Sequence, residues 1–473
     1  MRHSPLDGGS GRTTEPDAGI RVTALDTVPD LAELHRSDPS DYPYLLKSVS
    51  SADAQTGCDV LFCRPTGILR LDWQRDAFVL SASGSAPSPD GVNFLAALNN
   101  WFADEAHQGP AHALPFVGGW FLYLGYELAA QIEPVLKLPM SNSEPIAVAC
   151  RVVEAIVVVH DAQGRTAFHV REVGAEGPVV FDAINATKSS IPAQREPVQV
   201  VMTESPPDAF TDAVQAALDA IGEGQVYQAN LSRSWSGRMQ GGASLDLFDR
   251  LCAVNPAPFA GLADFGDFKV ISSSPERLVQ VSQRRVSARP IAGTRPRGRT
   301  AAEDQALVSE LLGTPKEQAE HVMLIDLARN DLGRVCQAGS VHVDEYMSIE
   351  SYAHVHHIVS NVTGELLDTA GPGEVIASVF PGGTITGCPK VRCMQLIADL
   401  EGEPRGAYTG SIGYLNLNGD MDLNILIRTF SWRAGQLSCR AGAGIVADSR
   451  PIRELDETRH KARGLLRAVG GES

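Results

Sequence analysis

Runs of strand length dominate the first part of the chain and constrain its fold more than any other feature. Between residues 57 and 161 they read GCDVLFCRP, GILRLDW, AFVLSAS and ACRVVEAIVVVHD, with turn-forming residues between them. β-Branched and aromatic residues at this density indicate strands. A mixed, largely antiparallel sheet with covering helices fits this pattern better than a regular alternation of strands and helices. We therefore expect an α+β fold.

The second part of the chain has a different texture. Residues 205–224, SPPDAFTDAVQAALDAIGEG, predict a capped amphipathic helix that stops at glycine. Residues 225–235 predict a strand. Residues 415–432 predict a hairpin, because Asn418 and Gly419 lie between two alternating runs.

The stretch 185–210 is rich in Pro, Ser and Thr and is the best linker candidate. It divides the chain into parts of unequal character. We expect a disordered N-terminus over residues 1–19, an N-terminal region over 20–190 and a catalytic region over 205–470.

The balance of charge excludes some partners. The chain of 473 residues carries a formal net charge of −17, which argues against broad binding to nucleic acid or to an anionic membrane. Eight cysteines without a C-x-x-C pair indicate neither a zinc site nor a disulfide framework and suit a reducing compartment. We recognise no signal peptide and no apolar run that could cross a bilayer. We expect a cytoplasmic protein that captures any anionic ligand with a local cluster of positive groups.

Two pairs of glutamates have helical spacing. Glu317 and Glu320 lie three residues apart on a predicted helix, and Glu454 and Glu457 repeat the arrangement with Lys461 one turn further on. A hard cation such as Mg²⁺ takes carboxylates together with substrate oxygens and waters. Converging pairs would supply that site, although a solvated helix face is the commoner role for such a pair.

Two segments are candidates to meet an anion. The stretch 288–299, ARPIAGTRPRGR, carries four arginines and is too interrupted for a helix. In the stretch 380–402, a turn rich in Gly and Thr runs into a helix opened by Pro389, with Thr384 as a hydroxyl donor. The alternative is a tight turn that needs its glycines for geometry only.

Arg428 lies in the otherwise apolar stretch LNILIRTF, where a guanidinium needs a carboxylate from the protein or from a ligand. The glycines of CRAGAGIVADS let a ligand approach the main chain closely, and Tyr408 could supply a hydroxyl. Together these features predict a Mg²⁺-assisted site for a small carboxylated molecule.

Six segments in order resemble the chorismate-utilising enzymes, in particular the large subunits of anthranilate and 4-amino-4-deoxychorismate synthases. They are RPIAGTRPRG, EHVMLIDLARNDLGRV, GGTITGCPK, AYTGSIGY, LNILIRT and GAGIVADS…ELDETRHKAR. The resemblance is dense over residues 205–468 and looser over 40–180. It implies a two-layer antiparallel β-sandwich with helices on the outside, binding chorismate and Mg²⁺ in a cleft.

The resemblance also implies roles for individual residues. Glu320 and Glu457 would coordinate Mg²⁺, with Glu317 and Glu454 as supporting carboxylates. His357 would lie near the leaving hydroxyl, and Glu276 would be the general acid or base. The residues expected to hold chorismate are Gly293, Thr294, Thr384, Tyr408, Arg428, Gly442, Ala443, Gly444 and Lys461.

The family has a tryptophan pocket, which is regulatory in anthranilate synthases. Its two elements match YLLKS, with Ser48, and NPAPFAG, with Pro258 and Phe259. The segment ADAQTGCD between them departs from the family's usual aromatic and basic residues. We expect both elements to pack rather than to bind tryptophan.

Two branches of the family compete for the product. Ala292 in PIAGT matches anthranilate synthases, because aminodeoxychorismate synthases resemble PIKGT with a lysine that attacks C2 of chorismate. GEGQVYQANLS, FPGGTITG, MDLNILIRT, GCDVLFCRP and GYELA favour the aminodeoxychorismate branch instead. We favour amination at C4, with ammonia adding at C2 in place of the lysine, for para-aminobenzoate and folate synthesis.

Ammonia must come from elsewhere, because no G-x-C-x-G nucleophile elbow of a glutamine-hydrolysing module is present. The resemblance therefore implies a separate glutamine amidotransferase subunit. The alternatives are anthranilate synthesis, an isochorismate or salicylate synthase that uses water, and a non-catalytic subunit.

Overall fold

The computed structural model describes residues 19–470, apart from 50–56, 90, 107–112, 176–179, 181–183, 185–197 and 353–354. The expected disordered N-terminus therefore lies outside the described residues except for Gly19, and so does the larger part of the linker candidate. Among the described residues, no helix is long and apolar enough to span a membrane.

Strands make up the centre of the molecule, and every pairing between them is antiparallel, as expected from the sequence. The strands are β1 (Ile20–Ala24), β2 (Tyr44–Lys47), β3 (Gly57–Gln74), β4 (Ala77–Gly84), β5 (Gly119–Leu124), β6 (Ala147–Asp161), β7 (Gly164–Glu172), β8 (Thr203–Glu204), β9 (Gln228–Arg238), β10 (Phe259–Asp264), β11 (Phe268–Ser274), β12 (Arg277–Ser282), β13 (Arg285–Ala288), β14 (Ile291–Pro296), β15 (His342–Ser351), β16 (Val355–Glu365), β17 (Gly387–Cys388), β18 (Ser411–Asn416), β19 (Met421–Asn424), β20 (Thr429–Arg433) and β21 (Gln436–Ile445).

The ladder has two halves that meet at the long strands β3 and β6. One half runs in the order β9, β21, β20, β11, β10 and β2. The other runs in the order β5, β18, β19, β12, β13 and β16. Strands β2 and β5 both pair with this centre, β2 with β3 and β5 with β6.

Aromatic side chains fill the space between the two halves. Tyr44 of β2 stacks on Phe121 of β5 with ring centroids 4.1 Å apart. The ring centroids of Phe268 in β11 and Tyr123 in β5 are 5.6 Å apart. Because each pair joins a strand of one half to a strand of the other, the halves form the two layers of a sandwich.

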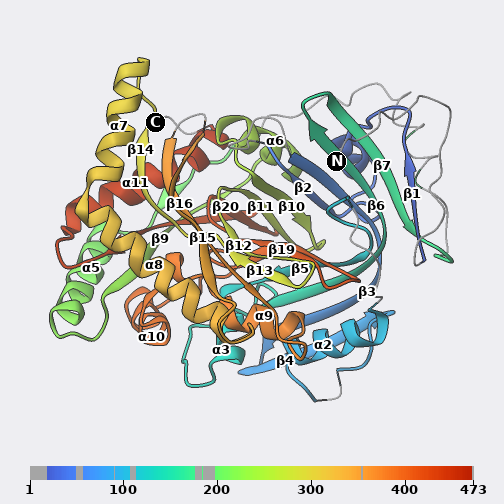
Figure 1. Cartoon of the computed structure of the whole chain (residues 1–473), viewed down its shortest axis with the longest axis horizontal. Helices are drawn as coiled ribbons and strands as arrows, with labels where there is room; N and C mark the ends of the chain where they lie inside the picture. Colours follow the sequence, from blue (N-terminus) through green and yellow to red (C-terminus); the bar gives the residue numbers. More distant parts are fainter. Residues whose placement is uncertain are drawn as a thin grey trace.

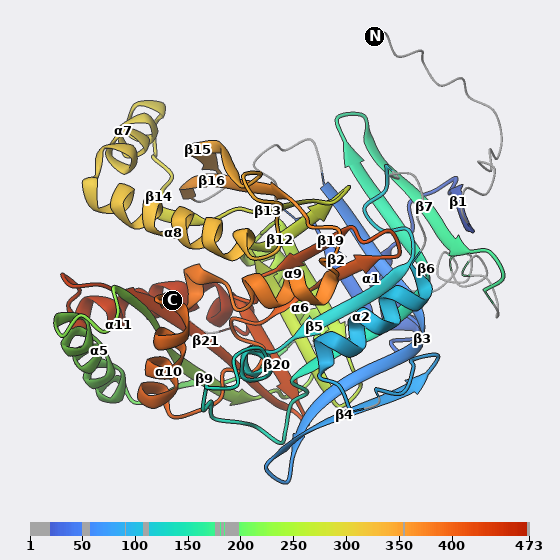
Figure 2. The ribbon, with the colours of Figure 1, turned by 60° about the horizontal axis from the view of Figure 1, so that its bottom comes forward.

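Helices cover the outside. They are α1 (Leu31–Ser37), α2 (Phe94–Glu105), α3 (Ala129–Ile132), α5 (Pro207–Gly222), α6 (Ser244–Val254), α7 (Ala301–Gly313), α8 (Pro315–Gly333), α9 (Pro372–Val379), α10 (Lys390–Glu401) and α11 (Pro451–Ala468), with 3₁₀ turns η1 (Tyr126–Leu128) and η2 (Gly383–Ile385). Figures 1 and 2 show α5, α8, α10 and α11 at one end of the molecule and β1 and β7 at the other.

Local sequence signals explain several of these elements. The helix predicted at 205–224 is α5, which buries Phe210, Val214 and Ala217 at helical spacing. The predicted hairpin is β18–β19, and Gly419 adopts a φ of +87° in its turn. One detail differs from the prediction: Pro389 precedes α10 in an extended conformation instead of opening it, so the helix begins at Lys390.

The two sequence regions share one sheet. Strands β2 and β5 of the N-terminal region pair with β10 and β18 of the C-terminal region. The boundary near residues 190–205 therefore remains a sequence prediction, and the backbone hydrogen bonds of the sheet cross it.

This shared sheet predicts one cooperative unfolding transition. Leu415 of β18 is fully buried and pairs with Trp120 of β5. Leu415→Ala should lower the free energy of unfolding by about 2–5 kcal/mol, because it leaves a cavity in the core. Urea unfolding followed by tryptophan fluorescence and circular dichroism should show one shifted transition in both signals. Val79→Ala on the exposed face of β4 is the control; two transitions of which only one shifts would contradict the prediction.

Candidate active site

Arg428 carries a guanidinium that no described residue pairs. It lies between β19 and β20, and its φ of +54° is in the left-handed region, which is strained for a residue with a side chain. Burial lowers the pKa of Arg428, with only the hydroxyl of Tyr408 acting in the opposite direction. Among the described residues, no hydrogen bond or ion pair reaches its guanidinium. A partly buried cation without a described protein carboxylate is suited to a carboxylate from a ligand.

Strands β9 and β21 form a cradle beside Tyr408. A Cβ atom at Gly442 would lie 2.8 Å from the Tyr408 hydroxyl and 2.7 Å from Asn230 Oδ1, so only glycine leaves this space open. Burial raises the pKa of Tyr408 to about 12, which keeps its phenol neutral and able to donate a hydrogen bond. Asn230 Oδ1 is buried and has no partner among the described residues, so it can accept a hydrogen bond from a ligand.

The cradle extends to the first helical glutamate pair. A Cβ atom at Gly444 would lie 2.8 Å from Gln228 Nε2 and 4.0 Å from Glu320 Oε1. Gln228 donates from Nε2 to Glu320 Oε1 over 3.2 Å, and its own Oε1 is buried and unpartnered among the described residues. Sequence reasoning used Gln228 and Asn230 only to choose a branch and did not select them as site residues. The available signal was their alternation along β9, the strand that pairs with the glycines of β21.

Glu276 lies at the end of β11 and is enclosed. Thr384 of η2 donates from Oγ1 to Glu276 Oε1 over 2.6 Å. Burial raises the pKa of Glu276 to about 7, while the Thr384 hydrogen bond and the charge of Lys461 act in the opposite direction. A carboxyl with this pKa exchanges its proton near neutrality, as a general acid or base must.

His357 of β16 lies opposite Thr294 of β14, and Thr294 Oγ1 is 3.0 Å from His357 Nδ1. Burial lowers the pKa of His357, and Arg428 contributes to the lowering. The imidazole is therefore neutral near pH 7. Gly293, in the irregular register next to Thr294, has a φ of +70°, and a Cβ there would meet Glu317 Oε2 at 2.9 Å.

Three of the four arginines in the stretch 288–299 pair with protein carboxylates, so these three side chains do not meet a small anion as the sequence suggested. Arg289 bonds Glu345 and Glu350, each over 2.6 Å. Arg297 pairs with Asp304 over 2.9 Å. Arg295 pairs with Glu310 over 3.0 Å and with Glu317 over 3.2 Å. Half of the segment is the half-exposed strand β14, which the sequence did not predict, and its centre, Ala292, is buried against β16.

The four predicted metal ligands lie on two helices, Glu317 and Glu320 on α8 and Glu454 and Glu457 on α11. They do not form one cage: among the described residues, no three acidic, His or Cys side chains gather where a metal ion could bind. Glu317 is held by Arg295, and Glu457 pairs with Lys461 over 2.8 Å. Mg²⁺ usually takes only one or two protein carboxylates, with substrate oxygens and waters. Glu320, whose Oε1 lies at the open glycine cradle, fits that donor set.

The predicted tryptophan elements lie together where β2 pairs with β10, whereas the cradle is formed by β9 and β21. The Ser48 backbone N–H donates to Asp59 Oδ1 over 3.1 Å. The guanidinium of Arg277 covers the ring of Phe259 at 5.0 Å. These contacts agree with a packing role for Ser48, Pro258 and Phe259, which stays a prediction.

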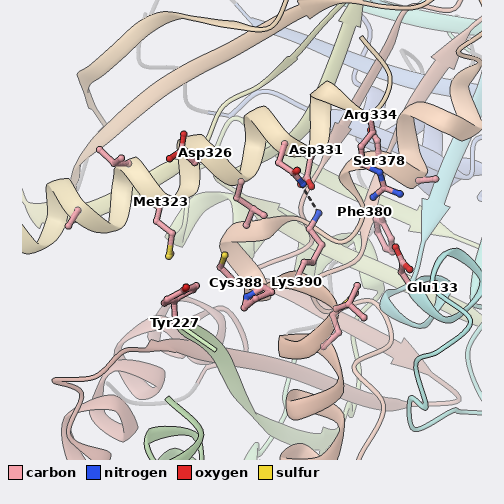
Figure 3. Close-up of a pocket in the computed structure, with 18 residues that line it drawn as sticks. Glu133, Tyr227, Met323, Asp326, Asp331, Arg334, Ser378, Phe380, Cys388 and Lys390 are labelled. Atoms are coloured by element: carbon pink, nitrogen blue, oxygen red, sulfur yellow. Dashed lines mark hydrogen bonds and ion pairs between the residues drawn. The ribbon is translucent and has the colours of Figure 1, made fainter. Parts of the chain in front are cut away.

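A pocket of about 790 Å³ lies along α8, and none of the predicted site residues is among those that line it. Its walls include Val322 and Met323 of α8 and Tyr227, the residue before Gln228. The ion pair of Asp331 with Lys390, at 2.6 Å, crosses it (Figure 3). The pocket therefore adjoins the site through Tyr227 and Ala319, the neighbours of Gln228 and Glu320.

Comparison with known proteins agrees with this geometry. The family of chorismate binding enzymes matches residues 64–467. An anthranilate synthase component I-like protein of Synechocystis sp. is 42% identical over 371 residues, 76% of this chain and 74% of its own length. Aminodeoxychorismate synthase component 1 of Bacillus subtilis is 39% identical over 391 residues, 79% of this chain and 82% of its own.

The fold is matched as well. The crystal structure of anthranilate synthase component I from Streptococcus pneumoniae superimposes with a TM-score of 0.74 and 31% identity, covering 87% of this chain and 92% of that one. The sequence match covers most of the chain, and the sandwich, with its unpaired guanidinium beside a glycine cradle, agrees with it. The chain therefore belongs to the family of chorismate binding enzymes.

Proposed function

We propose that this chain aminates chorismate at C4 with ammonia in a Mg²⁺-dependent reaction, giving 4-amino-4-deoxychorismate for para-aminobenzoate and folate synthesis. The unpaired guanidinium of Arg428 is the observation that carries the proposal. Chorismate is a ring carboxylic acid, and its carboxylate would supply the missing partner. The family match supplies the substrate class.

The ring carboxylate would lie between Arg428 and Tyr408. Tyr408 would donate its phenolic hydrogen, and the absence of a side chain at Gly442 would let the ligand reach the backbone of β21. Lys461, Gly293 and Thr294 would surround the rest of the molecule. These groups hold the substrate in one orientation, which removes much of the entropic barrier to reaction.

Glu320 and Glu457 would hold Mg²⁺, with Gln228 fixing the Glu320 carboxylate through its amide. A bound Mg²⁺ would supply positive charge that stabilises negative charge developing on the substrate. Glu317 and Glu454 would support this pair from the preceding turn of each helix.

Departure of the 4-hydroxyl requires a proton. Glu276, protonated for much of the time at neutral pH, and the neutral imidazole of His357 are the two candidates to deliver it. With alanine at position 292, ammonia would add at C2 as the hydroxyl leaves C4 with a proton. A second ammonia would then form the bond at C4 and expel the first, so no covalent adduct with the protein forms.

Ammonia is mostly ammonium at neutral pH, so the nucleophile needs protected delivery. A glutamine amidotransferase subunit is the proposed source. The names of the relatives, component I and component 1, support a two-part enzyme.

The second candidate is anthranilate synthesis. Ala292 favours it, as does the resemblance to relatives with that name. The product separates the two. Chorismate, Mg²⁺ and an ammonium salt should yield a compound that an added aminodeoxychorismate lyase converts to para-aminobenzoate, and a chelator should stop the reaction. Fluorescent ortho-aminobenzoate without the lyase would establish the second candidate instead.

Arg428→Gln should separate binding from folding. Loss of the charge that meets the ring carboxylate should lower kcat/KM for chorismate by about 100-fold, from a loss of ~3 kcal/mol. Because no carboxylate in the described part of the chain pairs with Arg428, the melting temperature of the variant should not fall. Arg151 is the contrast, because it donates two hydrogen bonds of 2.8 Å to Glu172. Arg151→Gln should lower the free energy of unfolding by about 3–5 kcal/mol. Equal losses of stability in the two variants would contradict the proposal.

The pKa of Glu276 predicts the pH dependence. With free ammonia held constant, kcat/KM for chorismate should fall above about pH 7, because deprotonation of Glu276 removes the acid. Glu276→Gln should abolish this fall in kcat/KM, the alkaline limb of the pH profile. Thr384→Val should move it to higher pH, since the hydroxyl stabilises the charged carboxylate. Thr386→Val, on the same turn but bonded to the Gly382 carbonyl, should leave the limb in place; a limb that moves in this control would refute the assignment.

A further inference from the structure

A buried ion network lies under the cradle, and the mechanism above does not use it. Arg405 follows α10 and is 5% exposed. It grips Glu401 through two hydrogen bonds, from Nη2 to Oε1 over 2.6 Å and from Nε to Oε2 over 3.0 Å. Burial disfavours the charge of Arg405, but Glu401 holds its pKa above the ordinary value. The charge is therefore permanent.

The remaining donors of Arg405 reach the walls of the active site. Nη2 donates to the Asn230 carbonyl of β9 over 2.7 Å. Nη1 donates to the Ile385 carbonyl of η2 over 3.1 Å. Asn230 contributes an open acceptor to the cradle, and Ile385 follows Thr384, the partner of Glu276. One guanidinium thus ties together two segments that lie more than a hundred residues apart in sequence.

The flat faces of the same guanidinium contact two aromatic rings. Its central carbon lies 5.5 Å from the ring centroid of Tyr408 and 4.9 Å from that of Tyr126 in η1. Tyr408 is thereby supported by Arg405, while its hydroxyl faces the cradle at Gly442.

We infer that Arg405 is a positioning residue that fixes Asn230, the Thr384 turn and Tyr408 around the substrate. The inference rests on the proposed function, since it deepens the description of that same site. The guanidinium of Arg405 contacts three walls of the site at once, through its planar set of N–H donors and through its contacts with two aromatic rings. A lysine ammonium cannot reproduce this geometry.

A purely structural ion pair is the competing explanation, and the chain offers a matched control for it. Arg440 of β21 shares the same carboxylate, donating from Nη2 to Glu401 Oε2 over 3.0 Å. Its other bonds go to Ser232 Oγ over 3.0 Å and to Glu403 Oε1 over 2.8 Å. Neither reaches Tyr408, Thr384 or the open Asn230 acceptor. Both arginines support the network, but only Arg405 bonds the Asn230 and Ile385 carbonyls and lies over the Tyr408 ring.

The test compares Arg405→Lys with Arg440→Lys in the full chain, with chorismate binding measured by calorimetry and turnover measured with ammonium. Both variants should lose thermal stability. Arg405→Lys alone should weaken chorismate binding and lower kcat, each by about tenfold, the cost of one displaced charge-assisted contact. It should also shift the Glu276 limb of the pH profile upward, since Thr384 is released. Arg440→Lys should keep both constants within about twofold.

Equal changes in both variants, or an unchanged pH profile in Arg405→Lys, would overturn the inference. If Arg405→Lys does not fold, two substitutions of Tyr126 provide a milder pair of variants for the same test. Its hydroxyl has no partner among the described residues, so Tyr126→Phe should behave as the wild type. Tyr126→Leu, which removes one stacking face, should shift binding and the pH limb in the same direction as Arg405→Lys. Identical behaviour of the Phe and Leu variants would also overturn the inference.

The outcome for the proposed function stays separate. A wild-type protein that binds chorismate without producing an aminated product would contradict the proposed function. The calorimetric comparison of the variants would then still decide whether Arg405 positions the binding site.

Discussion

A cation held in the protein without a counter-charge is the constraint around which this site is organised. Removing a guanidinium from water is costly unless a carboxylate compensates. Arg428 has no such partner among the described residues, and its backbone is held in a strained region. The surrounding strands offset this cost, because β19 and β20 are paired on both sides into the sheet. The structure thereby keeps a positive charge ready for a ligand, in a chain whose net charge is strongly negative.

The other arginines near the site show the opposite arrangement. Arg289, Arg295 and Arg297 are all paired with protein carboxylates. Their pairing fixes the segment that presents Gly293 and Thr294, and it leaves Arg428 as the guanidinium proposed to meet the anion. Arg405 extends the same logic, because its charge is neutralised by Glu401 and its geometry orders the cradle.

The geometry explains why the family can be assigned while the aminated product cannot be read from the structure. The groups proposed to meet the shared substrate, Arg428, Tyr408 and the glycines of β21, converge in the structure. The choice between C2 and C4 as the final site of amination depends on where the nucleophile enters and on how long the first adduct persists. In the proposed reaction, Ala292 would affect that choice only through the space it leaves. Relatives of both kinds accordingly resemble the chain to a similar degree.

Much of the fold and part of the site could be read directly from the sequence. Alternating and β-branched runs determined the antiparallel sheet, the spacing of Phe210, Val214 and Ala217 determined a helix, and Asn418–Gly419 determined a hairpin, because these are local preferences of neighbouring residues. The order of six motifs indicated the family. Which charges are paired could not be read in this way.

Only the tertiary structure decided that Glu317 is held by Arg295, that Gln228 orients Glu320, and that Arg405 braces Tyr408. It also decided that the four glutamates do not form one cage among the described residues. Each of these contacts joins residues distant in sequence, and hydrogen bonds and ion pairs depend on distances of a few tenths of an ångström. Sequence periodicity specifies which face of an element a residue occupies, but the packing of elements specifies what that face meets.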